Sequence, residues 1–365
     1  MVEADFQKRW DNIFPQSKVS AWALANRSRN VFGFLSSFGD YRDLQEEDFV
    51  VGIFGGSVAA QMAIFGGDIL VNQLEERDVG RVRLVNGAAG GFKQPQQLMV
   101  FSQMLLLGVP FDVVVNLDGL NEIRTGSFDA SDGYHPLFPS RSQYLKGLAF
   151  SAGAASRSEI ELAGGVIRAQ RLADTWRLSL AGRRWLQRSH LVRALVGSRI
   201  RMLEAEARNL EFQMQRLPSG SEKYVAELGD PCLSSSSTAC MSLIGDIWKR
   251  SSLAMAAIAH SEGIAYYHFL QPNQYVEGSK PFTDEERRIA LRETSLNAEV
   301  VRVGYPVLRE RGLEIKSRGV SFFDLTGVYL GREETIYRDS CCHVNWQGNQ
   351  ILGAAIGERI YGQAH

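Results

Sequence analysis

The sequence predicts a three-layer α/β/α domain with a mainly parallel five-stranded sheet and a helical insertion. Five short runs are apolar on both faces instead of alternating, which is typical of strands buried between helices. Helix-like stretches alternate with these runs, as the connections of a parallel sheet require. With 365 residues, 45% of them hydrophobic, the chain can bury such a core, and disorder, collagen and coiled coil are excluded as descriptions of the whole.

Each expected element follows from a local pattern. Thr283 followed by Glu286 forms a capping box, so a helix should begin there. Further helices are expected over residues 94–107 and 351–360, where apolar residues recur at helical spacing. The five β-rich runs predict strands over residues 49–54, 82–86, 112–118, 264–270 and 320–325.

The chain divides by composition into three parts. Residues 1–47 form an N-terminal extension without a clear period, expected to pack across the sheet edge or the insertion. Residues 48–123 and 262–365 form the α/β core. Residues 124–261 are poor in β-rich runs and are broken near 217–220 and at Asp230-Pro231, which predicts a mostly helical insertion between the third and fourth strands.

The insertion contains an arginine-rich segment, residues 168–201, with nine arginines against a single acid, Asp174. It is too charged to span a bilayer, and its apolar stripe should be covered by something. We expect the stripe to pack against the protein, as a lid or at a subunit contact. The alternative is peripheral contact with an anionic membrane. The stripe comprises Trp176, Leu180, Trp185, Leu191 and Leu195.

Charge and targeting patterns limit the partners and the compartment. A formal net charge of −1 argues against a nucleic-acid-binding protein, which usually carries a basic excess. The first residues lack the apolar region of a secretory signal, and no window resembles a membrane span. As written, the chain is expected to be cytoplasmic; if an N-terminal anchor was trimmed, it would be periplasmic or membrane-associated.

The four cysteines are too few for a disulfide scaffold in a chain of this length. The favoured expectation is that all four are thiols, although Cys232 and Cys240 bracket a Ser-rich loop and could pair. Cys341 and Cys342 are adjacent and expected to be packed thiols, with a vicinal disulfide as the rarer alternative. A zinc site would need C-x-x-C pairs with histidine partners, which are absent from the sequence. No metal and no cofactor is expected.

Four polar runs stand out at the ends of predicted strands or before a predicted helix. Residues 50–61 lead from a strand through Gly-Gly-Ser into a helix, residues 84–92 end in a glycine-rich loop, and residues 113–122 end in polar side chains. The carboxyl ends of parallel strands are where open α/β sheets place their sites. The fourth run, residues 337–349, supplies the histidine that the other three lack.

These runs together offer the parts of a serine nucleophile site. A serine attacks a carbonyl only when a base removes its proton, and histidine is the usual base near neutral pH. N–H donors must then hold the oxyanion. Ser57, His343, Gly91 and Asn121 meet these requirements.

The four runs resemble, in order, the blocks of the SGNH hydrolases of the GDSL esterase and lipase superfamily. Gly55-Gly56-Ser57 stands where the family usually has Gly-Asp-Ser, residues 86–91 are similar to the second block, and residues 119–122 to the third block, Gly-x-Asn-Asp. Residues 339–343, with the following Asn345 and Gly348-Asn349, resemble the fifth block. The closest form is a bacterial subgroup with a Gly-Gly-Ser first block and a segment over 270–275 that precedes Lys280.

The resemblance implies a role for each matching residue. Ser57 would be the nucleophile, His343 the base, and Ser57, Gly91 and Asn121 the oxyanion donors. The acid of the family usually lies three positions before the histidine, where this chain has Ser340. Either Asp339, one position further back, orients His343, or a backbone carbonyl does so and the site works as a dyad. The glycine at position 56 and Glu122 are expected to be tolerated variations.

The implied activity is hydrolysis of a carboxylic ester, such as an acyl or acetyl group on a carbohydrate or lipid. The same site would also transfer the acyl group to another alcohol, so an acyltransferase is an alternative. A non-catalytic binding module of the same fold is a second. A phosphate-binding loop over 52–57 is disfavoured, because no G-x-G-x-x-G motif or Walker lysine follows.

Several neighbouring residues allow two interpretations each. Lys93 and Arg124 could meet an anionic substrate group or could be solvated charges. The loop over 271–275 could form a substrate wall or an ordinary strand-to-helix connection. His268 lies on a strand that ends near the site, whereas the other histidines besides His343 are expected to be surface or core residues: His135, His190, His260 and His365.

Overall fold

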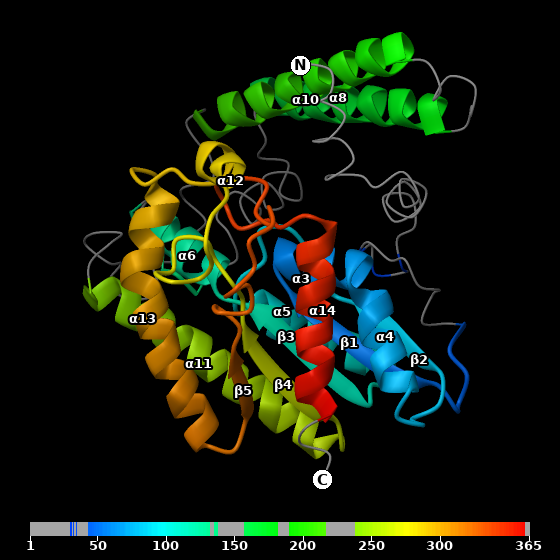
Figure 1. Ribbon diagram of the computed structural model, residues 1–365, viewed down its shortest axis with the longest axis vertical. Coiled ribbons are helices and arrows are strands. Elements are labelled where there is room, and N and C mark those ends of the chain that lie inside the picture. Colours follow the sequence, from blue (N-terminus) through cyan, green and yellow to red (C-terminus); the bar gives the residue numbers. More distant parts are fainter. Residues whose placement is uncertain are drawn as a thin grey trace. The chain divides into compact units, whose positions relative to one another are not determined.

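The computed structural model confirms the predicted fold class: a parallel five-stranded sheet lies between layers of helices (Figure 1). The residues that it describes are 30, 32, 34, 43–131, 135–137, 157–181, 190–216 and 238–361. The strand order is β2-β1-β3-β4-β5, the doubly wound order in which ligands bind beyond the carboxyl ends of the central strands. The strands are β1 Phe49–Gly55, β2 Val82–Asn86, β3 Val113–Asp118, β4 Ala265–Leu270 and β5 Ser321–Asp324.

The register brings the carboxyl ends of the central strands to the same level. Gly55 of β1 pairs with Leu117 of β3, and Asp118 of β3 pairs with Leu270 of β4. The strands are apolar on both faces because both faces are covered, and all six residues of β3 are buried. The polar loops that follow β1, β2 and β3 therefore all begin at the carboxyl ends of the strands, on one side of the domain.

Helices cover the two faces in the expected alternation (Figure 1). On one face α3, α4 and α14 pack together, and on the other α5, α6, α11 and α13 do. The expected capping box exists: the Thr283 side chain accepts the Glu286 N–H, and the Glu286 carboxylate accepts the Thr283 N–H. The helices of this unit are α3 Ser57–Phe65, α4 Gly67–Glu75, α5 Gln96–Leu106, α6 Leu120–Ser131, α11 Thr238–Ser261, α12 Asp284–Ile289, α13 Leu296–Ser317 and α14 Trp346–Tyr361.

The chain contains a second compact unit, which among the described residues consists of α8 (Arg157–Ala181) and α10 (His190–Arg216). The described parts of the arginine-rich segment, 168–181 and 190–201, thus belong to two helices, which pack through Ala173, Ile200 and Leu203. The unit is shorter than the predicted 124–261 insertion. The ends of that range, α6 and α11, belong to the first unit because they pack with α13 beside the sheet.

The apolar stripe of the arginine-rich segment is described only in part. Trp176 and Leu195 are 41% and 62% exposed. The side chains of Leu180 and Leu191, and the whole of Trp185, lie outside the described residues. Its packing against protein, self-association and membrane contact all stay predictions. None of the helices in the described ranges is long and apolar enough to cross a membrane.

The cysteines differ in part from expectation. Cys240 is disulfide-bonded, so the expectation of four thiols is wrong for this residue. Cys232, the partner considered from sequence, lies outside the described residues. Cys341 and Cys342 are free thiols.

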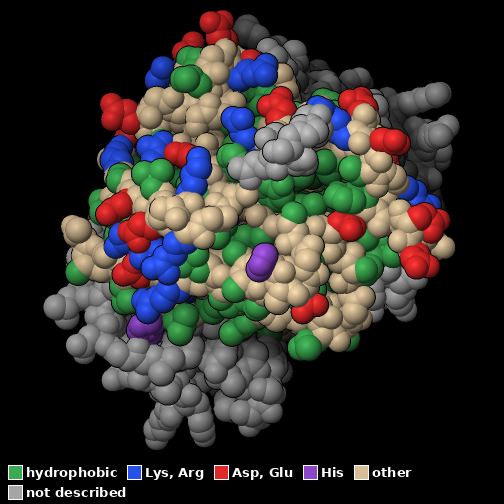
Figure 2. Space-filling model, turned by 90° about the horizontal axis from the view of Figure 1, so that it is seen from below, with side chains coloured by type: hydrophobic (Ala, Val, Ile, Leu, Met, Phe, Trp, Pro, Cys, Tyr) green, Lys and Arg blue, Asp and Glu red, His purple; other side chains and the backbone are tan. Residues whose placement is uncertain are grey.

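A small part of the N-terminal extension is described, and it lies against the sheet edge. The Asn30 side chain donates to the Asn86 carbonyl at the end of the edge strand β2, 2.8 Å away, and the ring of Phe34 meets that of Phe92 edge-on. On the described part of the face shown in Figure 2, basic and acidic side chains are interspersed, in keeping with the small net charge.

Candidate active site

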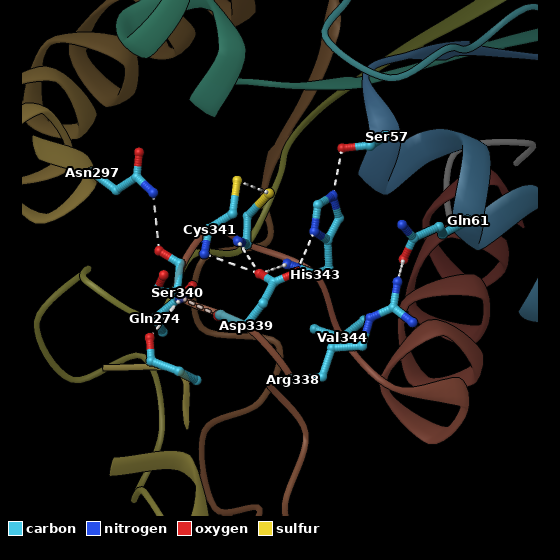
Figure 3. A network of polar contacts seen from close by, with 12 residues as sticks. Ser57, Gln61, Gln274, Asn297, Arg338, Asp339, Ser340, Cys341, His343 and Val344 are labelled. Atoms are coloured by element: carbon cyan, nitrogen blue, oxygen red, sulfur yellow. Dashed lines mark hydrogen bonds and ion pairs between the residues drawn. The ribbon is translucent and has the colours of Figure 1, made fainter. Parts of the chain in front are cut away.

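Ser57, His343 and Asp339 form one chain of hydrogen bonds (Figure 3). His343 Nε2 lies 2.8 Å from Ser57 Oγ, and His343 Nδ1 lies 2.6 Å from Asp339 Oδ2. Ser57 is the first residue of α3, directly beyond the carboxyl end of β1, whereas His343 and Asp339 belong to the loop before α14. Of the two arrangements left open for the acid, the structure contains the one with Asp339.

The loop over 338–343 explains how an acid four positions before the histidine reaches it. The Arg338 N–H donates to the His343 carbonyl, and Tyr337 and Val344 form an isolated antiparallel β-bridge. The two ends of the loop therefore lie side by side. Inside it, Asp339 Oδ1 accepts the backbone N–H groups of Cys341, Cys342 and His343, at 2.9, 3.2 and 3.3 Å. One carboxylate oxygen thus shapes the turn while the other meets the imidazole.

These contacts also set the charge of the acid. Partial burial acts to raise the pKa of Asp339, but the hydrogen bonds from the His343 ring and from the backbone outweigh it and lower the pKa to about 2. Asp339 is therefore ionised at every pH at which histidine can act as a base. An ionised acceptor at Nδ1 keeps a proton on that nitrogen and leaves Nε2 free to accept the serine proton.

The segment after β4 supports this loop from outside. Asn273 Nδ2 donates to the Cys341 carbonyl at 3.2 Å, Gln274 Nε2 to the Asp339 carbonyl at 2.9 Å, and the Tyr275 hydroxyl to the Ser340 carbonyl at 3.0 Å. All three side chains are buried. The polar groups of the 271–275 segment, considered from sequence as a substrate wall, thus hold the loop over 338–343 (the acid–base loop).

Two further contacts tie the loop to the helices around it (Figure 3). Asn297 of α13 donates to the Ser340 carbonyl at 2.9 Å. On the other side, Arg338 donates to the Gln61 side chain of α3, one turn after Ser57, at 2.9 Å. The helix that carries the serine and the loop that carries the histidine are therefore connected directly.

The start of α3 offers N–H groups for an oxyanion. Gly56 is its N-cap and supplies no side-chain cap, so the first N–H groups, including that of Ser57, face outward from the positive end of the helix. Gly55 has a φ of 142°, and a Cβ there would lie 2.0 Å from the Leu117 carbonyl oxygen. The turn between β1 and the serine therefore requires a glycine.

The other two expected oxyanion donors are Gly91, in the loop after β2, and Asn121, the second residue of α6. Asn121 Nδ2 donates one hydrogen to the Phe92 carbonyl at 2.8 Å, and an amide NH₂ group carries a second N–H. A Cβ built on Gly56 would lie 2.3 Å from the same Nδ2. Asn121 therefore lies directly against the residue before Ser57. Gly91, beside Phe92, has a φ of 80°, which suits glycine.

Buried carboxylates lie beneath these loops. Glu122 accepts the Gly119 N–H on one oxygen at 2.8 Å, and the Gln94 N–H and the Gln97 side chain on the other at 3.0 and 3.1 Å. Burial, and next the charge of Asp118, raise the pKa of Glu122 to about 8, although the backbone N–H groups of Gly119 and Gln94 act to lower it. Glu122 thus joins the loop after β2, which carries Gly91, to Gly119, which lies two residues before Asn121.

Three other candidates lie outside the hydrogen-bonded chain. Lys93 is buried, bonds the Pro136 carbonyl and lies 3.4 Å from Asp129, so the two roles weighed for it from sequence are both wrong. Arg124 donates to Asn297, at 2.7 Å. His268 is buried, with its ring nitrogens 2.9 Å from Asp118 and 2.7 Å from Ser252.

Among the described residues, one group has donor atoms close enough to share a metal ion. It consists of Cys341, Cys342 and His343, whose ligand atoms lie within 4.8 Å of one another. Both ring nitrogens of His343 already meet Asp339 and Ser57. A metal held by all three residues would therefore have to break the Ser57–His343–Asp339 chain.

A cavity of about 620 Å³ lies elsewhere, between α4, α14 and the segment after β5. Neither Ser57 nor His343 lines it. Ser57, Asn121 and His343 are partly exposed, whereas Asn273, Gln274 and Tyr275, which hold the loop over 338–343, are buried.

No family model matches the chain, and no curated protein matches it. A solved structure of a GDSL-like lipase from Bacteroides thetaiotaomicron is similar to it at 10% sequence identity, over 87% of this chain and 90% of that chain, with a TM-score of 0.39. At this identity and TM-score, the function has to be inferred from the residues of the chain itself.

Sequence reasoning missed the supporting residues. Gln94 and Asn297 hold the loops but follow no motif that predicts such a role, and Glu122 is expected from sequence only as a tolerated variation. One signal existed for the 271–275 segment: several amide side chains directly after a buried strand need partners if they are buried too.

Proposed function

We propose that the chain is a serine hydrolase of the SGNH type that cleaves a carboxylic ester through an acyl-enzyme on Ser57. The observation that carries the proposal is the chain of hydrogen bonds from Ser57 Oγ through both nitrogens of His343 to Asp339, with distances of 2.8 and 2.6 Å. A partly exposed serine, a base and an ionised acid in this order are what acyl transfer needs.

The first half of the proposed reaction forms the acyl-enzyme. Ser57 Oγ attacks the ester carbonyl carbon while His343 Nε2 takes the hydroxyl proton. The carbonyl π electrons move to the oxygen, and the Ser57 N–H, the Gly91 N–H and Asn121 Nδ2 stabilise the resulting oxyanion. The charge of Asp339 stabilises the imidazolium that forms. As the oxyanion collapses, the C–O bond to the alcohol breaks and His343 returns its proton to that leaving group.

The second half repeats these steps with water. His343 removes a proton from water, the hydroxide attacks the acyl carbon, and Ser57 leaves with the proton from His343. An alcohol in place of water would give acyl transfer. The acyl group belongs to an ester of a carbohydrate or lipid in this proposal.

The test is covalent labelling and turnover. Wild-type chain should react with a fluorophosphonate probe at Ser57 and hydrolyse p-nitrophenyl acetate, and Ser57→Ala should do neither while melting at the wild-type temperature. Ser261→Ala is a matched control, because Ser261 is an exposed serine at the end of α11. Equal turnover by Ser57→Ala and wild type would refute the proposal, and a folded wild type without labelling would indicate a binding module.

A further inference from the structure

Two free thiols directly precede the proposed base. Cys341 Sγ and Cys342 Sγ lie 3.4 Å apart, with Cys341 partly exposed and Cys342 buried. In an extended strand, the side chains of adjacent residues point to opposite faces. Here the turn shaped by Asp339 brings the two sulfur atoms into contact. The contact is thus a product of the acid–base loop itself.

We propose that Cys341 and Cys342 form a modification site at which a two-electron oxidant of the peroxide class closes a vicinal disulfide and disables the neighbouring His343. Formation of the disulfide does not depend on which reaction the protein catalyses. The loss of activity rests on the proposed function.

The chemistry begins at the more accessible sulfur. The Cys341 thiolate attacks one oxygen of hydrogen peroxide, so that an S–O bond forms, the O–O bond breaks and hydroxide leaves, which takes up a proton from solvent to become water. The Cys342 sulfur then attacks the Cys341 sulfenic acid: the S–S bond forms, the S–O bond breaks, and the oxygen leaves as water with the Cys342 proton. The two sulfur atoms together lose two electrons to the peroxide.

The surroundings favour this order of attack. The hydrogen bond from the Cys342 thiol lowers the pKa of Cys341 to about 7 despite partial burial, and the His343 ring contributes to the lowering. The same contact raises the pKa of Cys342. Cys341 is thus the thiolate that meets the oxidant, and Cys342 is the resolving thiol already within contact distance.

Ring closure has to move the peptide between the two cysteines. The sulfur atoms must approach from 3.4 Å to about 2.05 Å. Adjacent Cα atoms lie about 3.8 Å apart, less than the roughly 4.4–6.8 Å that most disulfides span, so the ring is strained, and we expect its closure to turn the peptide between the two Cα atoms. Such a strained disulfide is also easily reduced, which makes the modification reversible.

That peptide is part of the support of the acid. Its N–H, on Cys342, donates to Asp339 Oδ1 at 3.2 Å, and its carbonyl, on Cys341, accepts from Asn273 at 3.2 Å. Rotation breaks both hydrogen bonds. Because the other oxygen of Asp339 holds His343 Nδ1, a shifted carboxylate no longer orients the ring towards Ser57. Oxidation two residues away is therefore expected to act on the base.

The experiment treats the full chain with hydrogen peroxide and follows mass and activity together. The peptide that contains residues 341 and 342 should lose two hydrogens, and both kcat for p-nitrophenyl acetate and the rate of fluorophosphonate labelling should fall at least tenfold. Dithiothreitol should restore both. Cys341→Ser keeps the backbone of the loop and should be active and resistant to peroxide. Cys342→Ala is a second variant, should the first not fold.

Three results would overturn the proposal: oxidation that stops at one added oxygen on Cys341, a disulfide that leaves activity unchanged, or equal inactivation of wild type and Cys341→Ser. If the reduced chain turns over no ester, the proposed function fails, and the mass measurement still decides whether the disulfide forms.

Discussion

Replacing Asp339 by asparagine tests whether the carboxylate sets the protonation of His343. The substitution exchanges one oxygen for an NH₂ group, and the loop determines which one. Asp339 Oδ1 accepts three backbone N–H groups, so an amide turned with its NH₂ towards them would lose three hydrogen bonds, at about 0.5–1.5 kcal/mol each. The amide oxygen therefore stays at the Oδ1 position, and the NH₂ group lies where Oδ2 was, 2.6 Å from His343 Nδ1.

In that position the amide gives His343 the wrong tautomer. Nδ1 has to accept a hydrogen bond, so the ring proton moves to Nε2, which faces Ser57 Oγ and can no longer take its proton. We expect kcat to fall by about 10⁴, equivalent to roughly 5 kcal/mol of transition-state stabilisation. The three backbone hydrogen bonds of the turn remain, so the melting temperature should stay close to that of wild type.

The assay is steady-state hydrolysis of p-nitrophenyl acetate, with thermal unfolding measured on the same samples. Asp284→Asn makes the same chemical change on the exposed first turn of α12 and should leave kcat unchanged. A fall in kcat of less than tenfold for Asp339→Asn would refute the reasoning, because a backbone carbonyl would then be orienting the imidazole.

Three further predictions concern the residues around Ser57, His343 and Asp339. Asn121→Ala should lower kcat by about 10² to 10³ through the loss of one oxyanion donor. Gly56→Ala should lower kcat by nearly as much, because its Cβ would lie 2.3 Å from Asn121 Nδ2. Wild-type kcat in either variant would exclude Asn121 as a donor. Gln274→Met leaves the Asp339 carbonyl without its donor, so the free energy of unfolding should fall by about 1–3 kcal/mol in denaturant titrations. We also expect kcat to fall with KM unchanged. An unchanged kcat would show that the Gln274 hydrogen bond is dispensable for activity. The pKa of Glu122 is about 8 in the folded chain against an ordinary 4.5, so the folded state binds more protons between these values, and this residue should make the protein less stable as the pH rises through that range. Urea midpoints from pH 5 to 9 should therefore fall more steeply for wild type than for Glu122→Gln, and parallel curves would contradict the assignment.

The sequence alone determined the sheet and the order of its loops. Strands buried on both faces have to be continuous apolar runs, so β2 occupies its predicted range and β1 and β4 differ from theirs by one residue. The helix after Thr283 was predicted because a capping box is a contact within four residues. Gly-Gly-Ser and the other glycine-rich loops could be located for the same reason, since turn conformations depend on the residues in the turn.

The limits of the insertion were decided by tertiary packing. An amphipathic helix has the same sequence pattern whether its apolar side covers a sheet or another helix. α6 and α11 therefore looked like the start and end of a separate helical segment, yet they pack with α13 in the first unit. Nothing within their own sequences distinguishes the two cases.

The arrangement around the acid was likewise beyond the sequence. The choice between Asp339 and a backbone carbonyl depends on a turn closed by Arg338 and His343 and held by side chains from another segment, such as Gln274. A side chain orients according to the groups that surround it in space, and here these come from residues more than sixty positions away in the chain. Local propensity fixes which elements form, and only the folded chain fixes which carboxylate, thiol and amide meet.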